Sequence, residues 1–312
     1  MNATLVDAAV TGAATTTPLR LAALLGKRPA VPLVMGILNV TPDSFSDGGQ
    51  FFESDAAIAQ ARRMAEDGAD ILDIGAESTR PYGGQKPVTA EDEMERLRTV
   101  LPAVIALGRE RGIPISIDTI KAKTCAWALE QGAAIANDVW GLQQDPDMAR
   151  VVAEHSVPVI IMHNRDKADA GIDIVADINA FFARSLDIAA KAGIAREQIA
   201  LDPGIGFGKT PEQSVETLRR YDEIDFAGLP VLVGASRKRF IASVVPSTPD
   251  KRIGGSLAAH LHAAQKGAAI IRAHDVAETV QALRIAAAIG AQSGGVGTGL
   301  PQDCAPAKNE GV

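Results

Sequence analysis

Polar and charged residues recur where short apolar segments of this sequence end. Asp118 ends the segment IPISID, Asp202 ends QIALD and Arg272 ends AAIIR, while Asn137 follows AAIA. Carboxylates and amides form hydrogen bonds with heterocycles, and guanidinium groups bind phosphate oxygens. Any one of these residues could simply begin a polar turn. Together they predict a ligand that has both a polar ring edge and an anionic group.

Eight apolar segments lie between residues 32 and 290, and segments with helical spacing separate them. Alternating strands and helices indicate a parallel sheet, and eight such units within about 250 residues are typical of a single α/β (β/α)8 TIM barrel. These barrels place their chemistry at the carboxyl ends of the strands, so the polar residues should meet at one rim. The expected strands span 33–40, 69–77, 113–119, 133–139, 157–163, 198–204, 229–236 and 268–274.

One catalytic domain is expected at 31–291, with a flexible N-terminal extension at 1–30 and a flexible C-terminal tail at 292–312. Of the 312 residues 46% are hydrophobic, yet no apolar run approaches the length of a membrane helix. A formal net charge of −7 argues against a nucleic-acid-binding surface. Two cysteines, Cys125 and Cys304, do not make a disulfide framework. We therefore expect a cytoplasmic protein with no membrane or nucleic-acid partner.

Several motifs resemble those of dihydropteroate synthases and occur in the same order. They are GILNVTPDSFSDGG (36–49), DIGAESTRP (73–81), ISIDT (115–119), ND (137–138), LDPGIGFGK (201–209), SRK (236–238) and RAHD (272–275). The resemblance spans nearly the whole barrel. It implies a transferase of folate biosynthesis that condenses (7,8-dihydropterin-6-yl)methyl diphosphate with 4-aminobenzoate to give 7,8-dihydropteroate and diphosphate.

The sequence departs from this family at two places. Asn164-Arg165-Asp166 stands where the family often has Met-Gln-Gly, and Ala76 stands where it often has a second glycine. The first departure leaves the role of the loop after the fifth strand open. The second is a conservative change.

The pterin site implied by the resemblance has chemical reasons in the residue types. A pterin presents a ring N–H beside an exocyclic amine, so one buried carboxylate can accept from both, and Asp202 is assigned this role. Asp202 could instead cap the Pro203-Gly204 turn, and Lys238 could be a surface lysine. The expected catalytic residues are Asp118, Lys238 and Arg272. The expected pterin and diphosphate ligands are Thr79, Asp118, Asn137, Asp202, Lys238, Arg272 and His274, with Arg272 and His274 as the cationic donors to the diphosphate.

A second set of residues is expected to hold 4-aminobenzoate and a metal ion. Asn39 suits Mg²⁺ through its amide oxygen, with diphosphate oxygens and waters completing the octahedron. Mg²⁺ is the cofactor expected. The loop 36–49 should act as a lid, with Asp47 making a closing contact. The expected aminobenzoate pocket consists of Phe45, Thr79, Pro81, Phe207 and Ser236.

Two other functions remain open from the sequence. A folate-dependent corrinoid methyltransferase shares a pterin-binding barrel, but it needs a corrinoid partner and no aminobenzoate pocket. Ser236 and Lys238, together with Arg272 and His274, argue against it. A non-catalytic pterin-binding homologue is disfavoured by the intact set of rim residues. Because barrels of the resembling family are usually dimeric, a homodimer is expected.

Overall fold

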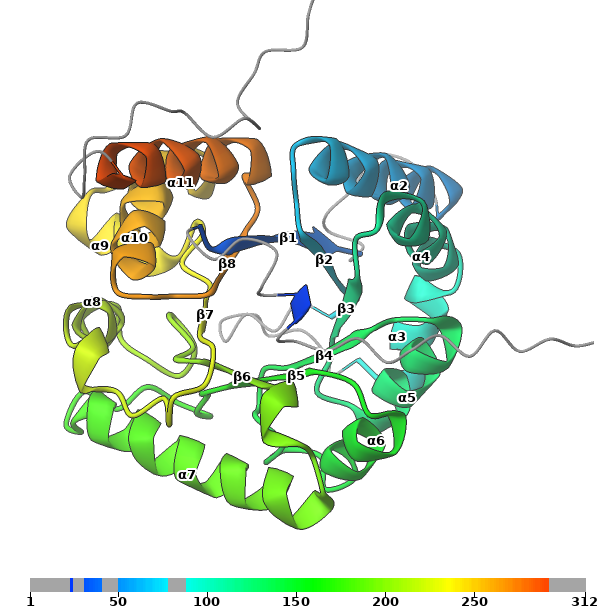
Figure 1. Ribbon diagram of the computed structural model, residues 1–312, viewed down its shortest axis with the longest axis horizontal. Helices are drawn as coiled ribbons and strands as arrows, with labels where there is room; N and C mark the ends of the chain where they lie inside the picture. Colours follow the sequence, from blue (N-terminus) through cyan, green and yellow to red (C-terminus); the bar gives the residue numbers. More distant parts are fainter. Residues whose placement is uncertain (1–22, 25–30, 41–49, 78–87, 292–312) are drawn as a thin grey trace, which may run out of the picture.

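The chain forms a barrel of parallel strands surrounded by helices (Figure 1). The computed structural model describes residues 23–24, 31–40, 50–77 and 88–291, without the side chains of residues 50–53. Within them the strands are β1 (Leu33–Asn39), β2 (Ile71–Gly75), β3 (Ile115–Asp118), β4 (Ile135–Asp138), β5 (Val159–Met162), β6 (Ile199–Asp202), β7 (Leu232–Val233) and β8 (Ile270–Ala273).

The sheet runs around the barrel with every neighbouring pair of strands parallel. The order is β6-β5-β4-β3-β2-β1-β8-β7. The remaining junction, between β6 and β7, is bridged just before β7 begins. There the Leu201 amide donates to the Pro230 carbonyl at 2.9 Å, and Leu201 pairs with Val231 in a parallel bridge. This topology confirms the (β/α)8 barrel that the sequence predicted.

Helices cover the outside of the barrel, and local sequence signals fix several of their ends. Asp173 caps α7 by accepting from the amides of Val175 and Ala176, and Thr210 caps α8 in a capping box with Gln213. None of the helices described is long and apolar enough to cross a membrane. They are α2 (Gln50–Glu66), α3 (Ala90–Leu97), α4 (Val100–Arg111), α5 (Ala122–Gln131), α6 (Met148–His155), α7 (Ile174–Ala192), α8 (Pro211–Arg219), α9 (Arg239–Val244), α10 (Ile253–Gln265) and α11 (Val276–Ala291).

The interior of the barrel has an apolar layer, and on β2, β4, β6 and β8 the residue two positions further along the strand is polar. The apolar layer comprises Leu33, Met35, Ile71, Ile135, Ile160, Ala200, Leu232 and Ile270. Because residues i and i+2 of a strand face the same side, Asp73, Asn137, Asp202 and Arg272 also face the interior, nearer the carboxyl ends. Alternate strand residues such as Leu72 and Ile117 pack outward against the helices. The alternation of these four strands therefore places their polar side chains at one end of the barrel.

Leu24 also belongs to the interior apolar cluster. Its side chain is 1% exposed and packs with the inward-facing strand residues. The short described segment at 23–24 lies at the centre of the barrel in Figure 1. The sequence had assigned this residue to a flexible extension, but a buried leucine stabilises a fold by roughly 1.5–3 kcal/mol. Part of the segment 1–30 thus contributes to the core of the barrel.

Candidate active site

A hollow lies at the carboxyl ends of the strands, where the sequence places the polar residues. It is partly open to solvent. Four of the residues expected to bind the pterin line it together, although they come from separate parts of the chain. The lining consists of Asn137, Val139, Met162, Asp202, Ile205, Phe207, Gly234, Lys238 and Arg272.

Arg272 connects two carboxylates at one side of this hollow. Its Nε donates to Asp73 Oδ2 at 2.7 Å, and its Nη2 donates to Asp118 Oδ2 at 2.7 Å. Asp73 Oδ2 also accepts from Asn137 Nδ2 at 3.0 Å. These side chains come from β8, β2, β3 and β4, so the strand order brings them together. Charge-assisted hydrogen bonds of this kind hold the planar guanidinium in a defined orientation.

The carboxylates of this cluster retain unused acceptor capacity. Asp73 Oδ1 and Asp118 Oδ1 are buried and have no hydrogen-bond partner among the residues that the structure describes. Burial raises the pKa of the Asp118 carboxyl well above its ordinary value, Arg272 opposes this rise, and the charge of Asp73 adds to it. Buried polar atoms normally have partners, so these oxygens are suited to accept donors from a bound ligand.

Asp202 and Lys238 belong to the β6 and β7 parts of the same hollow. Asp202 Oδ1 accepts from the Gly204 amide at 2.7 Å, so the carboxylate caps the following turn and also lines the hollow. Burial raises its pKa to about 6. Lys238 Nζ lies 3.9 Å from the centroid of the Phe207 ring, a cation–π distance. Both residues therefore line the hollow.

His274 and Ser236 contact each other beside Arg272. The His274 amide donates to Ser236 Oγ at 3.1 Å, and His274 Nδ1 lies 2.9 Å from the same oxygen. Burial, and after it the positive charge of Arg272, lower the pKa of His274 to about 3. The imidazole is therefore neutral at neutral pH in the free protein. It can offer a diphosphate an N–H group, but no charge.

Only some of the remaining expected substrate and metal ligands lie among the residues that the structure describes. Phe45, Thr79 and Pro81 lie outside the described residues, as does Asp47. Asn39 is the last residue of β1, half-buried, and its Cα pairs with that of Gly75. The described part of the chain has no cluster of three or more His, Cys, Asp or Glu side chains that could hold a metal. An amide oxygen at Asn39 fits Mg²⁺ only where a ligand supplies further oxygens.

Two buried residues of the site carried no assigned role at the sequence level. Asp73, 0% exposed, is the shared acceptor of Arg272 and Asn137. Its position two residues after Ile71 is a signal that it faces the interior. Lys209, 1% exposed, ends the motif LDPGIGFGK and lies under the loop that carries Phe207. Its sequence context, after a glycine-rich stretch, gives no sign of burial.

Comparisons with known proteins agree with this geometry. A family model described as "Pterin binding enzyme" matches residues 35–274. The dihydropteroate synthase of Bacillus subtilis is 46% identical over 244 residues, which cover 78% of this chain and 84% of that protein.

Solved structures show the same fold. A dihydropteroate synthase from Clostridium difficile, crystallised in the presence of pteroic acid, is 46% identical with a TM-score of 0.78, and the match covers 83% of this chain and 97% of that one. A dihydropteroate synthase from Xanthomonas albilineans with 4-aminobenzoic acid is 44% identical with a TM-score of 0.79, covering 84% and 94%.

Proposed function

Since this chain belongs to the pterin-binding enzymes and is a dihydropteroate synthase, we propose how its residues divide the work of that reaction. The reaction joins (7,8-dihydropterin-6-yl)methyl diphosphate to 4-aminobenzoate and releases diphosphate. The observation that carries the assignment of residues is that Asn137, Asp202, Lys238 and Arg272 line one hollow. Each has the chemistry that one part of the first substrate requires.

Asp202 and Asn137 bind the pterin ring. The ionised Asp202 carboxylate accepts from the ring N–H and the exocyclic amine, two donors that the hollow would otherwise leave unpaired. Asn137 already donates to Asp73, and its amide oxygen remains to accept from the ring. Lys238 supplies an ammonium for the ring carbonyl or N5, and its methylene stem lines the hollow. The buried position of Asp202 makes these hydrogen bonds selective for the pterin edge.

Arg272 and Asp118 act on the bond that breaks. The methylene carbon loses its diphosphate as the C–O bond lengthens, so negative charge grows on the leaving oxygen and positive charge spreads into the ring. Arg272, held by Asp73 and Asp118, is oriented before substrate arrives and stabilises the departing diphosphate. The Asp118 carboxylate stabilises the positive charge of the ring. His274 adds a neutral hydrogen-bond donor.

The arylamine then attacks the methylene carbon. Its nitrogen is neutral at neutral pH and carries a lone pair, so the step needs no strong general base. The amine forms the new C–N bond and releases one proton to solvent. Phe207 and Ser236 are the described residues assigned to the aminobenzoate, Phe207 as an apolar wall and Ser236 as a hydroxyl for its carboxylate.

Mg²⁺ is the metal that the proposal includes. Asn39 would hold it through one amide oxygen, together with oxygens of the diphosphate substrate. The ion neutralises charge on the diphosphate when it is bound. Because Asn39 is the one residue of the described chain assigned to the metal, the ion would enter with the substrate.

A homodimer is proposed from the surface of α11. Ile285 and Ile289, one helical turn apart, are 57% and 70% exposed, so an apolar strip faces outward. Sedimentation equilibrium of the wild type, compared with Ile289→Glu, tests this assignment. A wild-type dimer that the substitution converts to monomer supports it, and a wild-type monomer contradicts it.

The assignment of function is tested by diphosphate release with and without 4-aminobenzoate. Release that requires 4-aminobenzoate, with dihydropteroate formed in equal amount, is expected. A corrinoid methyltransferase would instead transfer a methyl group to a corrinoid protein and release no diphosphate. A non-catalytic homologue would bind the pterin without turnover.

A further inference from the structure

Lys209 is a buried lysine whose three ammonium hydrogens all have acceptors. Its Nζ lies 2.6 Å from His163 Nδ1, 2.9 Å from the Gly204 carbonyl and 3.3 Å from the Phe207 carbonyl. Burial lowers the pKa of Lys209 to about 7, and the charge of Asp202 opposes this fall. In the ammonium form the group has three donors and no acceptor, so these three contacts satisfy it completely. One bond reaches the end of β5, and the other two reach the loop 203–209 that follows β6. Lys209 thus fastens this loop to the neighbouring strand.

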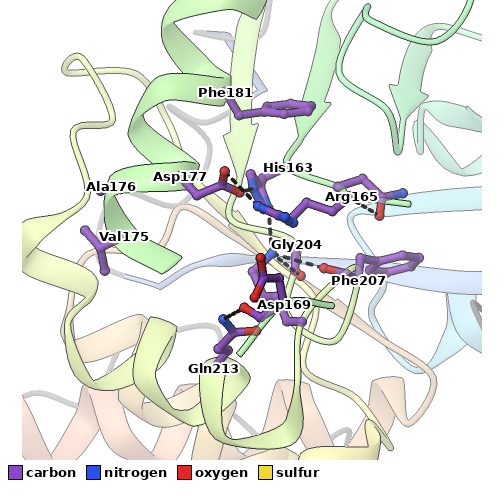
Figure 2. A network of polar contacts seen from close by, with 12 residues as sticks. His163, Arg165, Asp169, Val175, Ala176, Asp177, Phe181, Gly204, Phe207 and Gln213 are labelled. Carbon is purple, nitrogen blue, oxygen red and sulfur yellow. Dashed lines mark hydrogen bonds and ion pairs between the residues drawn. The ribbon is translucent and has the colours of Figure 1, made fainter. Parts of the chain in front are cut away.

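His163 is oriented for this role from its other side. Its Nε2 lies 2.9 Å from Asp177 Oδ2, and its ring packs edge-on against Phe181 with centroids 5.0 Å apart (Figure 2). Burial, and then the charge of Lys209, lower the pKa of His163 to about 4, so the ring is neutral at neutral pH. A neutral imidazole that donates from Nε2 to a carboxylate must accept at Nδ1. The tautomer required by Asp177 is therefore the one that Lys209 needs.

Asp177 is shared with Arg165, which belongs to the variant loop after β5. Arg165 Nη1 lies 2.9 Å from Asp177 Oδ1, so the carboxylate binds His163 with one oxygen and Arg165 with the other (Figure 2). The hydrogen bond from His163 is the largest cause that lowers the pKa of Asp177 to about 2. The carboxylate is therefore ionised. Arg165, where the family often has glutamine, extends the chain of contacts into the loop.

The two loops also pack closely through their backbones. A Cβ on Gly204 would lie 1.9 Å from the His163 carbonyl oxygen, and one on Gly208 would lie 2.5 Å from Arg165 Cβ. Both glycines have a positive φ, +66° and +53°, that other residues rarely adopt. No side chain fits at either position. The loop 203–209 therefore packs directly against residues 163–165, which follow β5, and the side-chain contacts of Lys209 and Arg165 add to this packing.

The loop 203–209 carries Phe207 and contacts Asp202, and both residues are assigned to substrate. The Gly204 amide donates to Asp202 Oδ1 at 2.7 Å, and the Gly204 carbonyl accepts both from Lys209 and from the Phe207 amide, the latter at 3.1 Å. Phe207 lines the hollow under Lys238. A shift of Gly204 would change the orientation of the Asp202 carboxylate and of the Phe207 ring together.

We propose that Lys209 and Arg165 are positioning residues for substrate binding: acting through His163 and Asp177, they hold the loop 203–209 so that it presents Asp202 and Phe207 to the substrates. The inference rests on the proposed function, because it assumes that pterin and aminobenzoate bind in the hollow. It gives the variant segment at residues 164–166 a role in this protein. Arg165 stabilises the substrate-binding loop from outside the hollow.

The first test is Lys209→Met, which keeps the length of the side chain and removes the three donations. The KM of each substrate should rise by roughly tenfold or more, while kcat stays within about twofold, because the groups that act on the leaving diphosphate are untouched. Lys191→Met is the matched control, since Lys191 is an exposed lysine on α7 paired with Asp187. Unchanged KM values, or a loss confined to kcat, would overturn the proposal.

Arg165→Met is the second test and does not depend on a buried substitution. The Arg165 side chain is 26% exposed, so the variant should fold, and its KM values should rise by roughly threefold. Hydrogen exchange at the amides of 204–207 should become faster in both variants. Unchanged exchange and unchanged KM in Arg165→Met would overturn its positioning role, even if Lys209→Met does not fold.

Wild-type turnover in the same assay separates this inference from the proposed function. Absence of wild-type turnover would contradict the function, while the exchange measurement would still test whether Lys209 and Arg165 hold the loop. Wild-type turnover with both variants unchanged would contradict the positioning role alone.

Discussion

Asp202→Asn should have opposite effects on pterin binding and on the stability of the free protein. The amide keeps one oxygen for the Gly204 amide, but it presents an NH₂ group where the second carboxylate oxygen stood. One pterin donor then faces another donor. An unpaired buried donor costs about 1–3 kcal/mol, so pterin affinity should fall by roughly fivefold to 150-fold.

The stability effect has the opposite sign. Burial raises the pKa of Asp202 from 3.8 to about 6, so folding favours the protonated form. This contribution to stability is fully present below the unfolded pKa and is lost as pH rises through the folded pKa. At about 1.4 kcal/mol per pH unit, the ionised carboxylate lowers the free energy of unfolding by up to about 3 kcal/mol near pH 8. Because asparagine does not ionise, Asp202→Asn should remove this decrease in the free energy of unfolding.

Calorimetry and urea unfolding measure the two effects. The variant should be more stable than wild type at about pH 8, and the difference should shrink as pH falls toward 4. Asp187→Asn is the control, because Asp187 is an exposed carboxylate on α7 that lies outside the hollow. Unchanged pterin affinity would remove Asp202 from the pterin site. Equal free energies of unfolding for the variant and wild type at high pH would refute the claim that burial raises the pKa of Asp202.

The other expected outcomes concern the opposite side of the hollow. Asp73→Asn removes a charge that orients Arg272, so kcat should fall by roughly tenfold or more in steady-state assays, and an unchanged kcat would exclude that role. Arg272→Lys keeps the positive charge but loses the planar guanidinium that binds two carboxylates. In calorimetry, this substitution should weaken the binding of pterin diphosphate more than the binding of diphosphate-free pterin. Chelation should abolish turnover and added Mg²⁺ should restore it, whereas activity that resists chelation would remove the metal role of Asn39.

The barrel could be predicted because its strands follow a simple local rule. Apolar segments that end in polar residues mark both the sheet and its functional end, and the observed strands lie within the predicted ones. β7 is shortened the most, since the sequence predicts a strand at 229–236 and only Leu232–Val233 is regular strand. Pro230 has no amide to donate, and the Val231 carbonyl accepts from two amides of the β8 segment. Such a junction depends on both neighbouring strands and is not visible in the segment alone.

The site residues could be predicted where they end a strand, and less well where tertiary contacts define them. Asn137, Asp202 and Arg272 were identified because each follows an apolar run. Asp73 lies inside its strand, because Ile74 and Gly75 continue the strand after it, so it does not show the same pattern. The burial of Lys209 depends on His163, 46 residues away, so no local pattern could indicate it. The neutral state of His274 likewise follows from burial, which only the packed barrel determines.

A crystal structure with a bound pterin substrate tests the central claim most directly. The account predicts the ring inside the hollow, with both Asp202 oxygens within hydrogen-bond distance of its donors and the diphosphate directed toward Arg272. A pterin bound outside the hollow, or one that does not contact Asp202, would contradict it.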